Sequence, residues 1–244
     1  MTDWDIFRLA CQALINGSNP YLVGTGEMRF YNPPWILIPL LPLAQLPPIP
    51  GLLANALVST VSLVVITRSL KMGIWETFLV LISPMHLQSL VYGNPEWIPL
   101  LGVLMPPPLA LVLYMTKPQA TFGLVLLLLV NEWKRGRWRA LGVTVAPTLI
   151  LALVSVMLWG LPPVPGPNNP GLRSIFPYSL IVGLPALALA LRSSDRRLAS
   201  FVGPFVSPYV TFHGYLPALF AFKGKWMALA VGVAFVPVLL GIVA

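Results

Sequence analysis

Charged residues and cysteine are scarce in this chain of 244 residues. Only 9% of the residues are charged, and the single cysteine, Cys11, excludes a disulfide bond within the chain. The two histidines do not combine with cysteine or acidic residues at metal-ligand spacing. So low a charged fraction is atypical of a soluble domain of this length. The chain is therefore expected to be embedded in lipid.

Sequence motifs of several enzyme classes are also missing. There is no glycine-rich phosphate loop, no Gly-x-Ser-x-Gly elbow, no metalloprotease His-Glu pair and no haem-type cysteine pattern. Residues 1–34 contain no apolar stretch of the kind that a cleavable signal peptide requires. These absences disfavour nucleotide-driven chemistry and predict no resident cofactor, with a divalent cation as the remaining alternative.

Apolar residues, by contrast, make up 57% of the chain, and the mean hydropathy is +0.82. Several apolar stretches approach the ~20 residues that a membrane-spanning helix needs, and they do not alternate with the period of a β-barrel strand. The 27 prolines and 19 glycines predict short broken or re-entrant helices among them. The sequence thus predicts an all-α polytopic membrane protein, with residues 35–244 as its transmembrane part. The apolar stretches are 51–67, 74–92, 96–116, 118–131, 139–160, 175–191, 198–222 and 226–244.

The net charge of +8 arises from basic clusters that lie between the apolar stretches. Cytoplasmic loops of membrane proteins carry such an excess of lysine and arginine, so these clusters are expected to face the cytoplasm. A basic face that would bind nucleic acid is not formed, and nucleic acid is excluded as a partner. The clusters are Arg68/Lys71, Lys134–Arg139, Arg192/Arg196/Arg197 and Lys223/Lys225.

Residues 1–34 precede the long apolar stretches and are expected to form an extracytoplasmic loop. Within it, residues 2–16 predict a short amphipathic helix that lies in the membrane interface and ends at Gly17. Thr2-x-x-Asp5 fits a capping box, which gives Asp5 a structural role at the start of this helix. The expected apolar face consists of Ile6, Leu9, Ala10, Ala13 and Leu14.

A series of short motifs follows along residues 3–215. In chain order they are Asp3-Trp4-x-x-Phe7-x-x-Ala10, Asn32-Pro33-Pro34-Trp35, Gly93-Asn94-x-Glu96, Lys117-Pro118-Gln119, the basic turn Glu132–Arg139, and Ser207-Pro208-Tyr209 with His213. In this order they resemble the GT-C-type membrane glycosyltransferases, especially the polyprenyl-phosphate-mannose-dependent α-mannosyltransferases and their small bacterial relatives. The family has a transmembrane helix before the first motif, and this sequence has none there. A partner helix or a second protomer is therefore expected to replace it.

The resemblance implies transfer of a hexose from a lipid-linked donor, a polyprenyl-phosphate sugar, to an extracytoplasmic acceptor at a bacterial plasma membrane. It implies that Asp3 is the catalytic carboxylate and that Lys117 contacts the carrier phosphate. Asp3, Glu96 and Lys117 are expected to converge on one outward-facing cavity. The further substrate-binding candidates are Asn94, Arg29, Tyr209 and His213.

The residues themselves allow other interpretations. A lysine within an apolar run costs roughly 2.5–3.5 kcal/mol to insert, so Lys117 requires either a polar partner or a side chain that reaches the headgroups. Glu96 could cap the following helix, with Trp97 in the aromatic belt at the membrane surface. A lone histidine such as His213 is more often hydrogen-bonded structure than a base, and Arg29 is more often solvated or bound to headgroups.

The function classes left open by the sequence are therefore three. A glycosyltransferase is favoured by the order of the motifs. A non-catalytic or degenerate GT-C-like subunit of a membrane complex is favoured by the lack of the first helix. A small transporter or channel is least favoured, because so few charged residues interrupt the apolar stretches.

Overall fold

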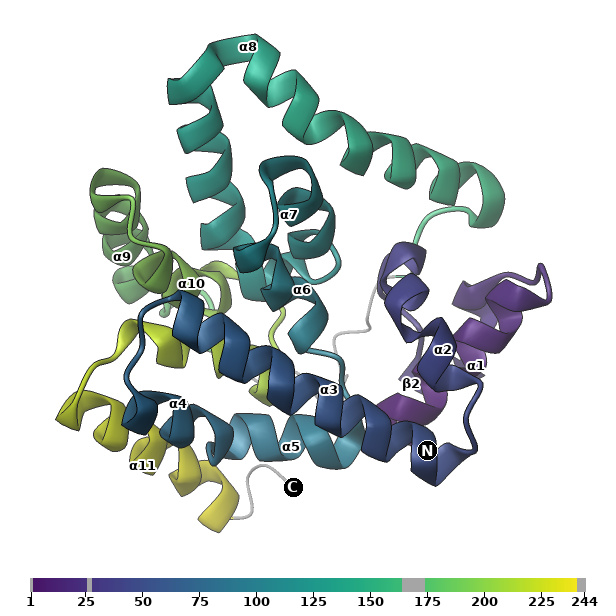
Figure 1. The fold of residues 1–244 in the computed structure, drawn as a ribbon, viewed down its shortest axis with the longest axis horizontal. Coiled ribbons are helices and arrows are strands. Elements are labelled where there is room, and N and C mark those ends of the chain that lie inside the picture. The colour runs from purple at the N-terminus through teal and green to yellow at the C-terminus, as the bar shows by residue number, and fades with distance from the viewer. Residues whose placement is uncertain (1, 26–27, 164–173, 241–244) are drawn as a thin grey trace.

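The structure, a computed structural model, describes residues 2–25, 28–163 and 174–240. The regular secondary structure of these residues is helical apart from one short antiparallel hairpin, in which Gly24 pairs with Arg29 and Thr25 with Met28 (Figure 1). The all-α prediction is therefore confirmed as a fold class, and the hairpin was not predicted because its strands are too short to show an alternating pattern. The α-helices are α1 (Asp3–Ile15), α2 (Leu41–Ala44), α3 (Pro48–Ser69), α4 (Ile74–Leu81), α5 (Pro84–Tyr92), α6 (Trp97–Leu101), α7 (Pro107–Tyr114), α8 (Pro118–Trp159), α9 (Leu180–Ser193), α10 (Arg196–Val206) and α11 (Lys225–Leu239). The 3-10 helices are η1 (Pro20–Leu22), η2 (Pro34–Leu40), η3 (Gly102–Leu104) and η4 (Phe212–Ala221), and the strands are β1 (Gly24–Thr25) and β2 (Met28–Arg29).

Two helices of the described chain, α3 and α8, are long and apolar enough to cross a membrane. Helices α4 and α5 pass the same test together, with a bend of 48° between them, and would supply a third span. The 22 residues of α3 correspond to about 33 Å of helix, close to the ~30 Å thickness of the hydrocarbon layer. Helix length and composition therefore indicate an integral membrane protein, as the sequence predicts.

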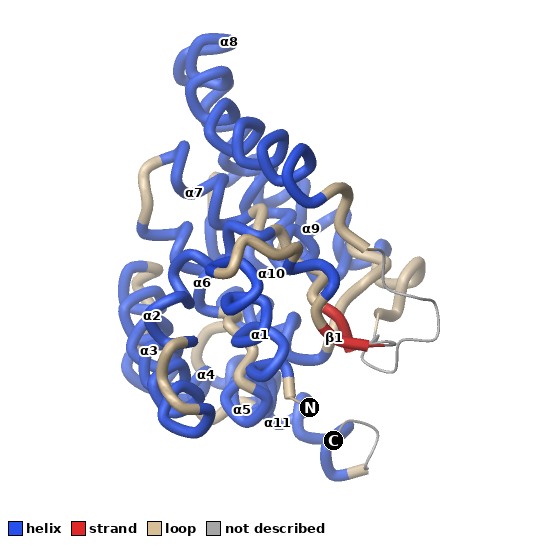
Figure 2. The backbone as a smooth tube through the Cα atoms, turned by 90° about the vertical axis from the view of Figure 1, so that its right-hand side faces the viewer, coloured by secondary structure: helices blue, strands red, loops and turns tan. Residues whose placement is uncertain are grey.

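Helix α8 consists of two helical halves joined by a sharp break. Gly136 and Arg137 have non-helical backbone angles, and the second half folds back and stands away from the body of the molecule (Figures 1 and 2). The break lies between the apolar stretches 118–131 and 139–160, where the sequence places a basic turn. Trp133 and Trp138 pack edge to face beside it, with ring centroids 4.8 Å apart.

Prolines account for much of the interruption of the other helices. Pro84, Pro107 and Pro118 each occupy the first turn of a helix, where their missing N–H is not needed. The apolar stretch 96–116 is consequently divided into α6, η3 and α7. This agrees with the prediction of short broken helices.

Helices α8 and α10 approach each other closely through two glycines. A Cβ on Gly123 would overlap the carbonyl oxygen of Ala199, and a Cβ on Gly203 would overlap that of Ala120. Small residues at such crossings are typical of helix packing in membranes, where van der Waals contact replaces the hydrophobic effect. The crossing fixes the start of α8, and with it the position of Lys117 directly before that helix.

The N-terminal segment has a hydrophobic core of its own beside the main helical core. Helix α1 packs against η2, α2 and the hairpin, and Trp97 and Ile98 of α6 complete this core. The apolar face predicted for α1 is partly wrong, because Leu9, Ala13 and Leu14 are only half-buried. Aromatic packing against the rest of the chain rotates the buried face, which consists of Trp4, Ile6, Phe7, Ala10 and Cys11.

Candidate functional site

The first turn of α1 separates the roles of its two aspartates. The amide of Thr2 donates to Asp5 Oδ2 at 2.8 Å, and the amide of Asp5 donates to Thr2 Oγ1 at 3.3 Å, which confirms the predicted capping box. The hydrogen bond from the Thr2 amide holds the pKa of Asp5 below its ordinary value. Asp3 takes no part in the cap, and its half-buried side chain is directed toward another part of the chain.

Trp4 determines where Asp3 lies. Its indole is 1% exposed and donates from Nε1 to the carbonyl oxygen of Pro48 at 3.1 Å. Gly93 ends α5 with a φ of +71°, and a Cβ at this position would overlap Trp4. Because Trp4 packs directly on Gly93, their sequence neighbours Asp3 and Asn94 are also brought together. Asn94 Nδ2 donates to Asp3 Oδ2 at 2.7 Å.

The turn at residues 93–96 is held by polar groups that sequence reasoning missed. Asn55 Nδ2 donates to the carbonyl oxygen of Gly93 at 3.1 Å, and Ser89 Oγ donates to that of Asn94 at 2.7 Å. The indole of Trp97 donates to Asn55 Oδ1 at 2.9 Å. A signal was present in the sequence, since Asn55 is the only amide side chain in the apolar stretch 51–67 and such a group needs a partner in lipid.

The alternative interpretation of this turn is therefore wrong. Trp97 is 5% exposed and packs in the N-terminal core, so it is not part of an aromatic belt at the membrane surface. Glu96 stands directly before α6, but its side chain makes no capping hydrogen bond with that helix. It is buried and turns toward a cation instead.

That cation is Lys117, which lies in the break between α7 and α8. Its ammonium group donates to Glu96 Oε1 at 2.6 Å and also to Asn94 Oδ1. Lys117 is 5% exposed and Glu96 is 1% exposed, so the two form a buried ion pair. The interpretation of Lys117 as a side chain that reaches the lipid headgroups is wrong, because a carboxylate inside the protein satisfies it.

His213 completes the set of joined side chains. Its Nε2 lies 3.4 Å from Glu96 Oε1 and 2.8 Å from the hydroxyl oxygen of Thr211. Hydrogen bonds, the ion pair between Lys117 and Glu96, and the close approach of His213 to Glu96 thus connect α1, the turn at 93–96, the break before α8 and η4. We call this set the buried polar network, which consists of Asp3, Asn94, Glu96, Lys117 and His213.

The remaining sequence candidates lie on segments next to this network. Arg29 is exposed on β2, in the hairpin that packs against α1. Tyr209 lies on the segment between α10 and η4, where its amide donates to Ser207 Oγ at 3.3 Å. No hydrogen bond joins the Arg29 side chain to a network residue in the described part of the chain.

Charge is distributed unevenly within the network. Glu96 matches the charge of Lys117, whereas Asp3 forms no ion pair with the described residues and accepts a hydrogen bond from a neutral amide. The second oxygen of Glu96 has no hydrogen-bond partner in the described part of the chain. A half-buried carboxylate without a cation, oriented by an amide, has the properties of a base that can accept a proton from a bound hydroxyl.

The described residues contain no group of three or more histidine, cysteine or acidic side chains arranged to hold a metal ion. Comparison of the chain with protein-family models, with curated proteins and with solved structures found no match. The features of this protein that point to a function are therefore the geometry of the buried polar network and the sequence motifs to which its residues belong.

Proposed function

We propose that this protein is a GT-C-like membrane glycosyltransferase, which transfers a hexose from a polyprenyl-phosphate donor to an acceptor on the extracytoplasmic side. The observation that carries the proposal is the buried polar network. Residues from separate motifs of the resemblance form one series of contacts, which runs from Asp3 through Asn94 and Lys117 to Glu96 and His213. Asp3 and Asn94, which share one of its hydrogen bonds, are 91 positions apart in the sequence. Burial of so many polar groups in an apolar protein is costly and is typical of functional sites.

The proposed reaction needs one proton acceptor. The acceptor hydroxyl oxygen forms a bond to the anomeric carbon of the donor sugar, and the bond from that carbon to the phosphate oxygen breaks. The polyprenyl phosphate leaves with the electron pair, and the hydroxyl proton passes to the carboxylate of Asp3. No nucleotide is consumed, so the reaction can take place outside the cytoplasm.

Asn94 and Lys117 position this carboxylate. The side-chain oxygen of Asn94 accepts a hydrogen bond from Lys117, so its amino group is left to donate to Asp3. Glu96 holds the ammonium group of Lys117 in place. The contact between Lys117 and a carrier phosphate stays a prediction. It would require the ion pair between Lys117 and Glu96 to break, so that the ammonium group can pair with the phosphate instead.

A non-catalytic membrane subunit is the second candidate, and one observation favours it. The ion pair between Lys117 and Glu96 is buried, so in this arrangement both groups satisfy each other as a structural pair would. On this interpretation the network only joins α1 to the helical body, and Asp3 has no chemical role. The two candidates are distinguished by measuring the activity of a variant in which Asp3 alone is changed and the rest of the network is kept.

The test compares the two neighbouring aspartates of α1. Purified Asp3→Asn and Asp5→Asn proteins in detergent are given a radiolabelled polyprenyl-phosphate hexose and a panel of hydroxyl acceptors. Loss of a general base typically lowers a rate by 10²–10⁴-fold, so we expect transfer by Asp3→Asn to fall by at least about 100-fold. Asp5→Asn disturbs only the cap and should keep its activity while unfolding slightly more easily.

Thermal unfolding of both variants serves as the control for folding. Asp3→Asn keeps a side chain of the same shape, so its midpoint should lie near that of the unaltered protein. Transfer that is unchanged in Asp3→Asn, or equally reduced in both variants, would overturn the catalytic role and favour the non-catalytic subunit.

A further inference from the structure

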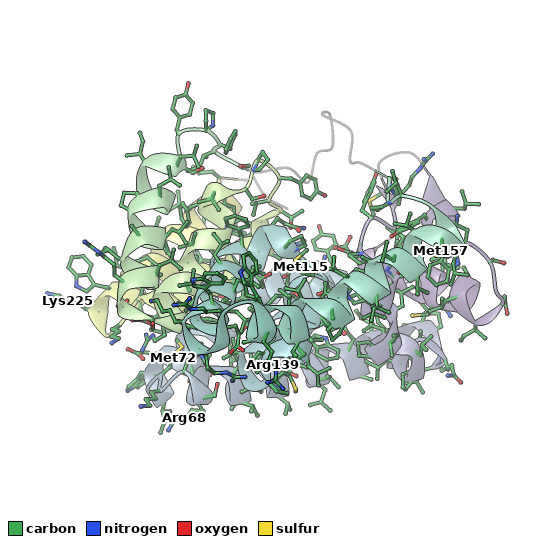
Figure 3. The ribbon with its side chains drawn as sticks, turned by 90° about the horizontal axis from the view of Figure 1, so that it is seen from above. Arg68, Met72, Met115, Arg139, Met157 and Lys225 are labelled. Carbon is green, nitrogen blue, oxygen red and sulfur yellow. The ribbon has the colours of Figure 1, made fainter. Side chains whose placement is uncertain are left out.

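A second charged site lies away from the buried polar network, where α3 ends, α4 begins and the chain enters α11. It is an open pocket of about 510 Å³. Arg68 and Lys225, which flank the pocket-lining residues in sequence, lie toward the end of the molecule opposite Met157 of α8 (Figure 3). We call this site the basic pocket, whose polar lining residues are Lys71, Glu76, Arg197 and Lys223.

Glu76 holds the walls of the basic pocket together. Its Oε2 accepts from the amide of Gly73 at 2.9 Å, and its Oε1 accepts from the amide of Gly224 at 3.0 Å. Arg197 lies 3.7 Å from the same carboxylate and donates from Nε to the carbonyl oxygen of Phe220 at 2.6 Å. These bonds connect α4, α10 and the segment before α11, so the pocket is a built feature of the fold.

The cations of the basic pocket outnumber its carboxylate. Glu76 is satisfied by Arg197 and by two amides, and it leaves the charges of Lys71 and Lys223 unmatched. Both lysines are exposed, and neither forms an ion pair with a residue that the structure describes. The pocket therefore has a positive potential that favours an anion.

Large apolar side chains border the same pocket. Trp75 is 76% exposed and Ile74 is 78% exposed, and both line it. Exposed tryptophan next to lysine at the end of an apolar helix is typical of the level of lipid headgroups. An anion that reaches this pocket from the membrane would thus meet cations at its phosphate and apolar side chains near its acyl chains.

We propose that the basic pocket binds the phosphate group of an anionic phospholipid. Basic pockets between membrane helices are suited to lipid headgroups, because their free lysines neutralise the phosphate while the acyl chains stay in the bilayer. The site is separate from Asp3 and does not depend on the proposed transferase activity. Inorganic phosphate is an anion like the headgroup but lacks the acyl chains, so it is the soluble probe for comparison.

The test measures lipid binding to the full chain in neutral detergent micelles. Phosphatidylglycerol, phosphatidylcholine and sodium phosphate are titrated separately, and bound lipid is counted by native mass spectrometry. A lysine at a membrane surface contributes enough to change affinity about fivefold, so Lys71→Gln with Lys223→Gln should weaken phosphatidylglycerol binding by about 25-fold. The control protein carries Lys134→Gln with Lys225→Gln, which changes the net charge equally outside the pocket lining.

Each outcome decides the proposal. Tighter binding of phosphatidylglycerol than of phosphatidylcholine, lost in the pocket variant and kept in the control variant, supports it. Equal binding of both lipids, or an equal loss in both variants, overturns it, because general surface charge then explains the result. Inorganic phosphate that binds as tightly as phosphatidylglycerol also overturns it and assigns the pocket to a soluble anion. Thermal unfolding without added lipid checks that both variants are folded.

Discussion

The buried polar network and the basic pocket use similar side chains in opposite ways. In both, a glutamate and a cation connect segments that are distant in sequence, Lys117 with Glu96 and Arg197 with Glu76. The network is closed, since Lys117 is only 5% exposed and its charge is matched. The pocket keeps exposed lysines whose charges have no partner in the described chain.

This difference shows how position decides what a charge does in a membrane protein. A buried ion pair has lost its water, so each partner depends strongly on the other and the geometry of the pair is rigid. An exposed lysine keeps its water and contributes little to folding, but its field still attracts anions. We therefore expect the network to control stability and the position of Asp3, and the pocket to control the choice of lipid.

The largest expected effect separates a buried from an exposed lysine. Lys117→Met leaves Glu96 as an unpaired buried carboxylate and should destabilise the protein by about 3–5 kcal/mol. The same substitution at the exposed Lys71 should change stability by less than about 0.5 kcal/mol. The midpoint of thermal unfolding in neutral detergent measures both.

A double variant sharpens this result. Lys117→Met combined with Glu96→Gln removes both charges, and the combined loss should be clearly smaller than the sum of the single losses. Additive losses, or equal losses in Lys117→Met and Lys71→Met, would show that the pair between Lys117 and Glu96 does not exist as described.

Gly93 is the next most sensitive position of the network. Gly93→Ala forces an alanine into a φ of +71° and drives its Cβ into Trp4, so we expect a loss of about 2–4 kcal/mol. The displaced Trp4 should also move Asp3 away from Asn94 and reduce transfer. Gly142→Ala is the matched control, because a Cβ there meets nothing within 4 Å and it should leave stability unchanged or slightly raised. Similar behaviour of the two variants would contradict the close packing of Trp4.

Asn55 tests the support of the turn at residues 93–96. Asn55→Ala leaves the indole N–H of Trp97 and the carbonyl oxygen of Gly93 without their partner, and we expect a loss of about 1–3 kcal/mol. Gln45→Ala removes an exposed amide whose one hydrogen bond within the described chain is to Leu41 of the preceding helical turn, so its effect should stay within about 0.5 kcal/mol. Thermal unfolding compares the two, and a harmless Asn55→Ala would mean that the turn is held by other contacts.

The smallest effect is expected in the basic pocket. Lys71→Gln and Lys223→Gln should each change the stability of the lipid-free protein by less than about 0.5 kcal/mol. A ligand that binds only the folded state raises the unfolding midpoint by mass action. Phosphatidylglycerol should therefore raise the unfolding midpoint of the unaltered protein. It should not raise the midpoint of the variant that carries both Lys71→Gln and Lys223→Gln. If either variant instead loses much stability in neutral detergent without lipid, the pocket lysines stabilise the fold, as Lys117 does in its buried ion pair.

Local features of the fold were predictable from the sequence. The capping box at Thr2 and Asp5, the break around Pro118 and the interruption at Gly136 follow from backbone rules that act within a few residues. The apolar face of α1 was only partly predicted, since its rotation depends on what packs against it. The hairpin at β1 and β2 was missed because its strands are too short to show an alternating pattern.

The sequence alone identified the chain as a membrane protein. Composition and the length of the apolar stretches determine this class, and neither depends on which segments of the chain pack together. The sequence also identified the polar residues that need partners in lipid, among them Asp3, Glu96 and Lys117. Only the tertiary structure decided the pairing. Asn94 reaches Asp3 across 91 positions of sequence because Trp4 packs on Gly93, and Lys117 finds Glu96 because α8 is fixed against α10. Such contacts depend on the distances between packed elements, which no local pattern of residues encodes.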